Sequence, residues 1–434
     1  MDLQKYFNCL ERIDPIRLNG RVTQVIGLII EAQGPAVNLG ELCYIFSKEE
    51  SLTLQAEVVG FKEDRILLMP LGEIKGIGPG CEVVASGRSL SVKVGNNLLG
   101  KVLDALGNPL DGSLLDFLGK DYPVNNVPPN PLTRERIHEP LEVGVRAIDG
   151  ILTCGKGQRI GIMAGSGVGK STLLGMIARN TKADINVIAL IGERGREVRD
   201  FIERDLGEEG LKRSVVIVAT SDQPALLRVK GALVATAVAE YFRDLGKNVL
   251  LMMDSVTRFA MAQREIGLAV GEPPTTRGYT PSVFAILPKL LERSGTSDLG
   301  SITALYTVLV EGDDMTEPVT DAVRGILDGH IILSRQLASQ NHYPAIDILG
   351  SVSRVMTEIV SPEHRKAASA LRNVLASYRE AEDLINIGAY EPCSNPKIDY
   401  AISKIADVND FLMQDVYEKV DYDQTVKKLL SLLS

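Results

Sequence analysis

The sequence has no tryptophan, and aromatic residues make up only 5% of its 434 residues. Proteins that bind single-stranded nucleic acid stack bases on aromatic side chains and follow the phosphates with a basic groove. A basic groove is not expected here, because 47 basic residues face 56 acidic ones and the formal charge is -9. Nucleic acid is therefore not predicted to be a partner.

Cysteine and long apolar runs are also scarce. The five cysteines lie far apart and form no CxxC pair, so neither a zinc site nor a disulfide framework is predicted and a reducing cytoplasm fits best. No apolar run reaches the roughly 18 residues that span a bilayer, and the first residues lack the basic and apolar regions of a secretion signal. We expect a protein that is neither secreted nor integral to a membrane.

The first part of the chain changes pattern twice. Residues 1–14 space their apolar side chains three or four apart, which predicts a short amphipathic helix, either a docking segment or a helix on its own domain. From residue 20 to about 84, short β-rich runs separated by glycine-containing turns predict a small β-barrel. A connector follows that is rich in Gly, Pro and Asn, including residues 107–112 and 125–132, and it is predicted to be an ordered loop.

The central part, from about Gln158 to Arg335, alternates compact apolar runs with helical stretches. Fully apolar strands that alternate with helices predict a parallel sheet covered on both faces. The six runs are RIGIMA, INVIALIG, SVVIVATS, NVLLMMDS, SITALYTVLV and HIILSR. After Ser361 the strands stop, and three helical stretches predict a helical C-terminal domain.

A glycine-rich turn between a strand and a helix, RIGIMAGSGVGKSTLL at residues 159–174, predicts a phosphate-binding P-loop. Lys170 would reach the β and γ phosphates, and the Ser171 hydroxyl would coordinate magnesium. Ala164 replaces the usual first glycine but ends the strand, where alanine should fit. The alternative is a tight turn with a chance lysine. The nucleotide-binding residues are predicted to be Ala164, Gly165, Ser166, Gly167, Val168, Gly169, Lys170, Ser171 and Thr172.

Acidic residues follow two other apolar runs. Asp254 ends NVLLMMD, where a Walker B carboxylate holds magnesium through water, although a helix N-cap aspartate gives the same pattern. Glu193 follows IALIG and is positioned to polarise the attacking water, with Arg194 next to it. The spacing alone equally fits a charged pair that begins a helix.

The order of these motifs resembles the hexameric rotary and secretion ATPases, a RecA-like family that includes the catalytic subunits of ATP synthase and the type III secretion ATPases. The likeness spans nearly the whole chain. The matching stretches are GVRAIDG (144–150), AGSGVGKS (164–171), IGERGREV (191–198), DSVTRFAMAQREI (254–266), GEPPTTRGYTPSVFAILPKLLERSG (271–295), DAVRGILDGHIILSR (321–335) and YPAIDILGSVSR (343–354).

Within that family, ERSG followed by DGHIILSR, together with LINIGAY (384–390), is most similar to the flagellar export ATPases, with the injectisome ATPases a close second. The resemblance implies ATP and Mg²⁺ as ligands and assigns roles to single positions. Glu193 matches the catalytic glutamate, Arg194 its neighbouring arginine and Asp254 the magnesium-side aspartate. Tyr343 matches an aromatic residue near the adenine, and Arg354 matches the arginine finger offered to the adjacent subunit.

The resemblance also implies an assembly. One chain carries the P-loop, Glu193 and Arg354 together, whereas rotary synthases divide these duties between two subunit types, so a homo-hexamer is expected. A surface salt bridge is the alternative role for Arg354. The expected partners are a stator-like regulator, a stalk-like protein, a membrane export gate and chaperone–cargo complexes, at the inner face of the cell membrane. The chain has neither the acidic DELSEED-like loop of rotary synthases nor the long insertion of vacuolar subunits.

The predicted function is ATP hydrolysis that energises flagellar type III protein export, with chaperone release and cargo unfolding. The alternatives are an injectisome ATPase, an RNA-dependent ring helicase, a catalytic subunit of a rotary synthase and a nucleotide-binding subunit without catalysis. The predicted fold is α/β, a RecA-like P-loop domain with a parallel sheet. The predicted domains are an amphipathic segment (1–18), a β-barrel (19–87), a RecA-like ATPase domain (88–350, with its core at 158–335) and a helical domain (351–434).

Overall fold

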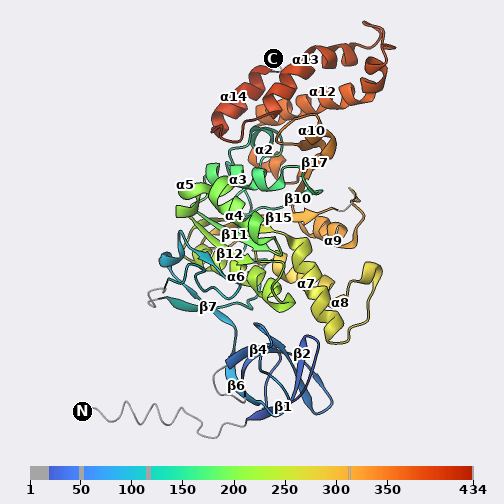
Figure 1. Cartoon of the computed structure of the whole chain (residues 1–434). Coiled ribbons are helices and arrows are strands. Elements are labelled where there is room, and N and C mark those ends of the chain that lie inside the picture. Colours follow the sequence, from blue (N-terminus) through green and yellow to red (C-terminus); the bar gives the residue numbers. More distant parts are fainter. Residues whose placement is uncertain (1–18, 48–52, 114–118, 311, 313, 433–434) are drawn as a thin grey trace, which may run out of the picture.

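The computed structural model describes residues 19–47, 53–113, 119–310, 312 and 314–432. Three parts follow one another along the molecule: a barrel, a central α/β domain and a helical domain (Figure 1). This order confirms the predicted fold class. The helix predicted for residues 1–14 lies outside the described residues, and the exact domain limits stay a prediction.

The barrel closes in the strand order β1-β2-β5-β4-β3-β6. Its interior is filled by alternate residues of these strands, such as Val22, Ile30 and Ile45, because successive side chains of a strand point to opposite faces. The strands are β1 (Gly20–Ile26), β2 (Ile29–Gln33), β3 (Glu41–Phe46), β4 (Thr53–Lys62), β5 (Arg65–Pro70) and β6 (Glu82–Ser89).

The central sheet has the strand order β17-β16-β10-β15-β13-β11-β12-β8, with β14 paired to β15 outside this path. All six apolar runs form parallel strands of this sheet, as predicted, and only β14 and β17 pair antiparallel. The strands are β8 (Val102–Leu103), β10 (Arg159–Ala164), β11 (Ile185–Ile191), β12 (Ser214–Ala219), β13 (Asn248–Asp254), β14 (Gly295–Thr296), β15 (Ser301–Leu309), β16 (Gly329–Leu333) and β17 (Ile346–Ser353).

Both faces of the central sheet are covered. Along β11, Val187 and Ala189 pack into one apolar cluster, whereas Ile188 and Leu190 pack into the other. This explains why the strand is apolar throughout. The helices of the central domain are α2 (Arg146–Ile151), α3 (Lys170–Asn180), α4 (Gly195–Asp200), α5 (Gly207–Lys212), α6 (Ala225–Asp244), α7 (Val256–Ala269), α8 (Pro281–Leu291), α9 (Pro318–Ile326), α10 (Arg335–Ser339) and α11 (Met356–Ile359), with a π-helical turn η2 (Phe201–Leu206) and short 3-10 turns η1 (Asn96–Leu98) and η3 (Thr276–Gly278).

The connector contains more structure than the sequence predicted. β7 (Ser91–Val94) pairs with β9 (Lys120–Pro123) in a small antiparallel sheet, and β8 joins the edge of the central sheet beside β12. These strands have two to four residues, too few for a periodic pattern to stand out. Residues 125–132 are free of helix and strand, in agreement with the predicted loop.

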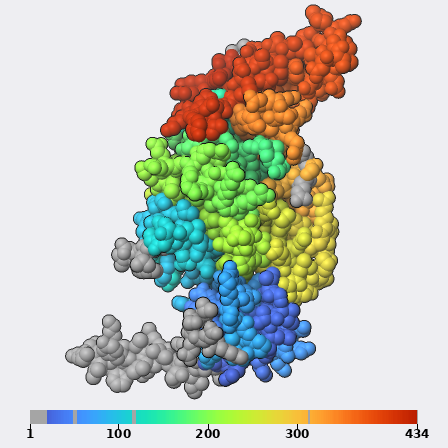
Figure 2. All heavy atoms as spheres, viewed as in Figure 1, coloured from blue at the N-terminus to red at the C-terminus, as the bar shows by residue number. Residues whose placement is uncertain are grey.

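The helical domain consists of α12 (Pro362–Asn386), α13 (Pro396–Leu412) and α14 (Tyr422–Leu432), which rest on the central domain (Figure 2). α12 and α13 begin where a capping residue precedes a proline: the side chain of Ser361 accepts from the His364 N–H, and that of Asn395 accepts from the Lys397 N–H. None of the described helices is both long and apolar enough to cross a membrane.

Buried ion pairs tie the parts together. Lys230 of α6 lies 2.8 Å from Oε1 of Glu57 in the barrel, and both side chains are less than a tenth exposed. Arg293 makes a bidentate pair with Glu240 at 2.7 and 2.8 Å and donates to the Val124 carbonyl of the connector. Since a buried charge without its partner is costly, each pair fixes one arrangement of the parts that it joins.

Candidate nucleotide-binding site

The glycine-rich loop lies at the carboxyl end of the central strand β10 and continues directly into α3. Gly167 and Gly169 have φ values of 78° and 90°, in the left-handed region that favours glycine. Gly169 precedes the first residue of α3 and has no side chain to cap the helix. The first N–H groups of α3 are therefore left for a ligand, and the helix dipole favours an anion there.

Ala164 occupies the last position of β10 and is 1% exposed. It pairs with Leu309 of β15 on one side and with Leu333 of β16 on the other. Its β-carbon is part of the packed sheet, so alanine replaces the usual glycine without disturbing the loop that follows.

Three charged residues that are far apart in the sequence meet at this edge of the sheet. Lys170 Nζ lies 2.5 Å from Asp254 Oδ1 and 3.7 Å from Glu193 Oε1. Their side chains are 12%, 5% and 14% exposed, so the cluster is almost dry. They meet because β10, β13 and β11 are parallel members of one sheet, and each residue comes just after or at the carboxyl end of its strand.

The Asp254 carboxylate is held from a second side. Thr307, a buried residue of β15, donates its hydroxyl to Asp254 Oδ1 at 2.8 Å. The next residue, Ser255, caps α7 by accepting from the Arg258 N–H. The sequence alternative for Asp254, a helix N-cap, is thus taken by Ser255, and the Asp254 side chain points to the lysine.

Burial gives Glu193 an unusual acidity. Desolvation is the main cause that raises its pKa, to about 7, and the nearby Asp254 carboxylate raises it further, whereas Lys170 opposes the shift. A hydrogen bond with Glu197 also favours the protonated form. A carboxyl group with a pKa near neutrality is suited to proton transfer.

Arg258 is a neighbour of this cluster that the sequence interpretation missed. Its side chain packs over Gly192, because a β-carbon added there would lie 2.7 Å from Arg258 Cβ. Its buried Nε has no hydrogen-bond partner among the described residues. The one signal available in the sequence was its position on the first turn of the helix after Asp254.

The structure places Tyr343 beside the P-loop and Arg194 away from the cluster. A β-carbon on Gly169 would lie 3.5 Å from Tyr343 Cε1, so the ring lies against the loop. Arg194, in contrast, is 82% exposed, and its ion-pair partner is Glu197 at 3.8 Å. Arg194 is therefore free to contact a ligand or a second chain but does not contact Lys170 or Asp254.

Arg354 lies at the opposite edge of the sheet. It follows the antiparallel strand β17, and its N–H donates at 3.0 Å to the carbonyl of Asp328, the residue before β16. It is exposed. The length of a six-residue strand, roughly 20 Å, separates this edge from the P-loop. The structure does not bring Arg354 to the cluster of its own chain.

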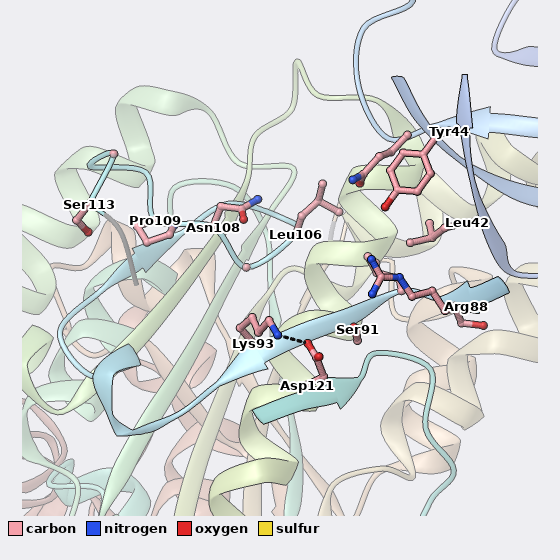
Figure 3. Close-up of a pocket in the computed structure, with 15 residues that line it drawn as sticks. Leu42, Tyr44, Arg88, Ser91, Lys93, Leu106, Asn108, Pro109, Ser113 and Asp121 are labelled. Carbon is pink, nitrogen blue, oxygen red and sulfur yellow. Dashed lines mark ion pairs between the residues drawn. The ribbon is translucent and has the colours of Figure 1, made fainter. Parts of the chain in front are cut away.

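A separate crevice of about 590 Å³ opens between the barrel and the connector (Figure 3). Tyr44 and Arg88 line it, and Lys93 and Asp121 form an ion pair across its floor at 2.9 Å. None of the predicted site residues lines this crevice. The candidate site is thus the carboxyl end of β10, not the crevice between the barrel and the connector.

Comparisons with known proteins agree with this geometry along the whole chain. Residues 22–87 match the ATP synthase alpha/beta family, beta-barrel domain; residues 144–353 match the nucleotide-binding domain of the same family; and residues 360–431 match the T3SS EscN ATPase C-terminal domain. The chain is 58% identical to the flagellum-specific ATP synthase of Bacillus subtilis, covering 100% of this chain and 99% of that protein. It is 53% identical to the type 3 secretion system ATPase of Xanthomonas euvesicatoria, covering 96% and 94%.

Solved structures show the same likeness. The assembled ATPase EscN from the type III secretion system of enteropathogenic E. coli matches with a TM-score of 0.90 at 47% identity, covering 96% of this chain and 100% of that one. The same protein in complex with its central stalk EscO matches with a TM-score of 0.89 at 46% identity, with the same coverage.

The raised pKa of Glu193 predicts a pH-dependent stability in the nucleotide-free protein. The folded state holds this proton more tightly than the unfolded chain does, so its stabilisation is complete below about pH 4.5 and is lost as the pH rises through about 7. Glu193→Gln removes the titration. The variant should therefore gain stability relative to the parent protein between pH 5 and 8, on the order of 1–3 kcal/mol, as measured by urea unfolding across that range.

Glu203→Gln is the matched control, because Glu203 is 62% exposed and lies on the same segment of the chain. Its substitution removes a carboxyl group at the surface of this segment and leaves the cluster intact. A stability difference for Glu193→Gln that does not change between pH 5 and 8 would contradict the raised pKa of Glu193.

Proposed function

The chain belongs to the ATP synthase alpha/beta family and is an ATPase of the type III export group, and from this premise we propose that six copies form a ring that energises flagellar protein export. The observation that carries the proposal is the separation of Arg354 from the Lys170, Asp254 and Glu193 cluster across the sheet. In each chain the nucleotide site then lacks an arginine finger, and Arg354 does not reach the site of its own chain.

ATP binds with its phosphates in the loop of residues 164–172. The loop N–H groups and the start of α3 surround the phosphates, and Lys170 exchanges the Asp254 carboxylate for the β and γ phosphate oxygens. Tyr343, against Gly169, forms the wall for the adenine. The two steps of this exchange are linked: Asp254 loses the Lys170 ammonium group only when a phosphate takes the place of its carboxylate.

The residues present suit a bound magnesium ion. The described chain has no cluster of three His, Cys, Asp or Glu side chains that would form a complete metal cage. Magnesium, which prefers oxygen ligands and keeps waters and substrate phosphates, fits the Ser171 hydroxyl and the Asp254 carboxylate. When bound, the ion neutralises charge on the transferred phosphoryl group.

Glu193 is the residue that activates water. Its pKa of about 7 lets it accept a proton at cellular pH. It lies 3.7 Å from Lys170, the residue proposed to hold the terminal phosphate. Two arginines are also placed near this acid: Arg194 follows it in the chain, and Arg258 packs over Gly192, the residue before it. The unpartnered Nε of Arg258 supports a contact with phosphate oxygens, and the exposed Arg194 supports a contact at the subunit boundary.

Arg354 completes the site of the next subunit. An arginine supplied from a neighbouring chain stabilises the charge of the transition state and contributes about 10³ to 10⁵ in rate. Because the same chain carries both halves of the site, a closed ring of identical copies satisfies every site at once. A single chain would lack this contribution to the rate.

Export is the work to which hydrolysis is coupled, through chaperone release and cargo unfolding. EscN, which matches in fold, has been solved with its central stalk. We propose a stalk-like protein, a stator-like regulator and a membrane export gate as the partners of this chain, with a peripheral position at the inner face of the membrane. Flagellar export is favoured over an injectisome because the chain is 58% identical to the flagellum-specific relative of Bacillus subtilis and 53% identical to the secretion ATPase of Xanthomonas euvesicatoria.

Two substitutions should separate ATP binding from turnover. Lys170→Ala is expected to weaken ATP binding, since the loop loses its only lysine, whereas Glu193→Gln should bind ATP normally and lower turnover at least a hundredfold. Nucleotide binding by calorimetry and phosphate release by a coupled assay measure the two effects. Normal phosphate release by Glu193→Gln would refute the proposed role and favour a different base.

Arg354→Ala should assemble into rings but hydrolyse ATP poorly. Rings that mix Arg354→Ala with Glu193→Gln chains should regain turnover that neither variant has alone, because a chain with an intact Glu193 can receive Arg354 from its neighbour. Arg324→Ala is a control that should keep turnover on its own, since the Arg324 side chain is 38% exposed and has a local partner in Asp321. No recovery of turnover in the mixed rings would mean that Arg354 is not shared between subunits.

The export system is decided by the proteins that accompany the chain. Affinity purification of the tagged protein from its source cell should recover flagellar basal-body and stalk components. Recovery of injectisome components alone would replace the flagellar assignment with the injectisome one and leave the ATPase site unchanged.

A further inference from the structure

Gln414 lies in the segment between α13 and α14, where the helical domain meets the central domain. Its side chain is almost fully buried, at 5% exposure, and makes three hydrogen bonds. Oε1 accepts from the Arg146 N–H at 2.8 Å, and Nε2 donates to the carbonyls of Gly144 and Glu418 at 2.9 and 3.1 Å. All the bonding groups of this amide are used, so its position is fixed.

The same segment is held by two arginines of the central domain. Arg146 of α2 donates to the Phe411 carbonyl at 3.0 Å and also contacts Met413 and Glu418. Arg179, near the end of α3, donates to the Val416 carbonyl at 2.7 Å. Residues 411–418 are thus attached to the two helices that precede and follow the P-loop strand.

Gln414 is also connected to the wall of the nucleotide site. Its backbone N–H donates to the carbonyl of Tyr343 at 3.0 Å, and the ring of Tyr343 lies against Gly169 of the P-loop. Tyr343 is 40% exposed, so its packing against the described chain is incomplete. The side-chain amide holds Gln414 in place, and the backbone N–H of Gln414 then supports Tyr343 through its carbonyl.

We propose that Gln414 is a positioning residue that fixes the Tyr343 ring beside the P-loop, and so sets how strongly the site prefers a nucleoside phosphate over bare phosphate. The inference rests on the proposed role of Tyr343 at the base. Lys170 and the loop amides grip phosphates without the help of Tyr343, whereas the base is gripped only when the ring is in place. Loss of the Gln414 amide should therefore affect one part of the ligand and spare the other.

The test compares ADP with inorganic pyrophosphate, neither of which requires turnover by this site. Gln414→Met keeps the length of the side chain and removes its hydrogen bonds. Stacking of a base on an aromatic ring contributes about ten- to a hundredfold in binding. Calorimetry on the full chain with magnesium should show ADP affinity reduced about tenfold by Gln414→Met, and pyrophosphate affinity unchanged within about twofold.

Two further variants distinguish positioning from simple loss of structure. Gln424→Met is the matched control, because Gln424 is exposed on α14, and both affinities should be unchanged. Tyr343→Ala should lower ADP affinity as Gln414→Met does, and the double variant should lose little more, since both substitutions remove the same contact.

The results distinguish failure of the positioning role from failure of the proposed function. Equal losses of ADP and pyrophosphate affinity in Gln414→Met, or additive losses in the double variant, would overturn the positioning role while leaving the nucleotide site intact. Equal affinity of the parent protein for the two ligands would overturn it as well, because no base contact would then exist to be positioned. A parent protein that binds neither ligand would defeat the proposed function itself.

Discussion

The ion pair between Lys170 and Asp254 is the interaction on which the rest of the site depends. It forms because parallel strands end at one edge of a sheet, so that a lysine and an aspartate 84 residues apart come within 2.5 Å. Because the cluster is nearly dry, the pair also affects the acidity of Glu193. Burial and Asp254 raise the pKa of Glu193, and Lys170 lowers it. A phosphate that draws the lysine away must therefore change the charge balance of both acids.

The two ends of the parallel strands carry different parts of the proposed site. The carboxyl edge gathers the P-loop, Asp254 and Glu193, and the amino edge carries Arg354 next to Asp328. No bending of a packed six-residue strand brings these edges together, since the sheet is covered on both faces and its core is close-packed. The fold itself thus requires a second chain if Arg354 is to touch a nucleotide.

Much of this was predictable from the sequence, because long apolar runs and glycine-rich turns are local signals. The six parallel strands, the barrel, the helical domain and the membership in an ATPase family were all predicted correctly. Thr307, Arg258 and Gln414 were missed, since each acts through a contact with a residue that is distant in the sequence or on another element. The strand β8 was missed for a related reason: its two residues are a strand only because β12 lies beside them.

The barrel and the helical domain are joined to the site from opposite sides by buried polar contacts. Lys230 anchors the barrel to α6, and the loop before α6 donates from the Ser221 N–H to the Glu193 carbonyl at 3.0 Å. The helical domain reaches the site more directly, since Gln414 bonds both to the chain around Gly144 and to Tyr343. Buried hydrogen bonds are costly to leave unmade, so these contacts hold the parts in one arrangement. The helical domain is therefore bonded to the Tyr343 side of the pocket, and the barrel is bonded to the helix that follows the loop on the Glu193 side.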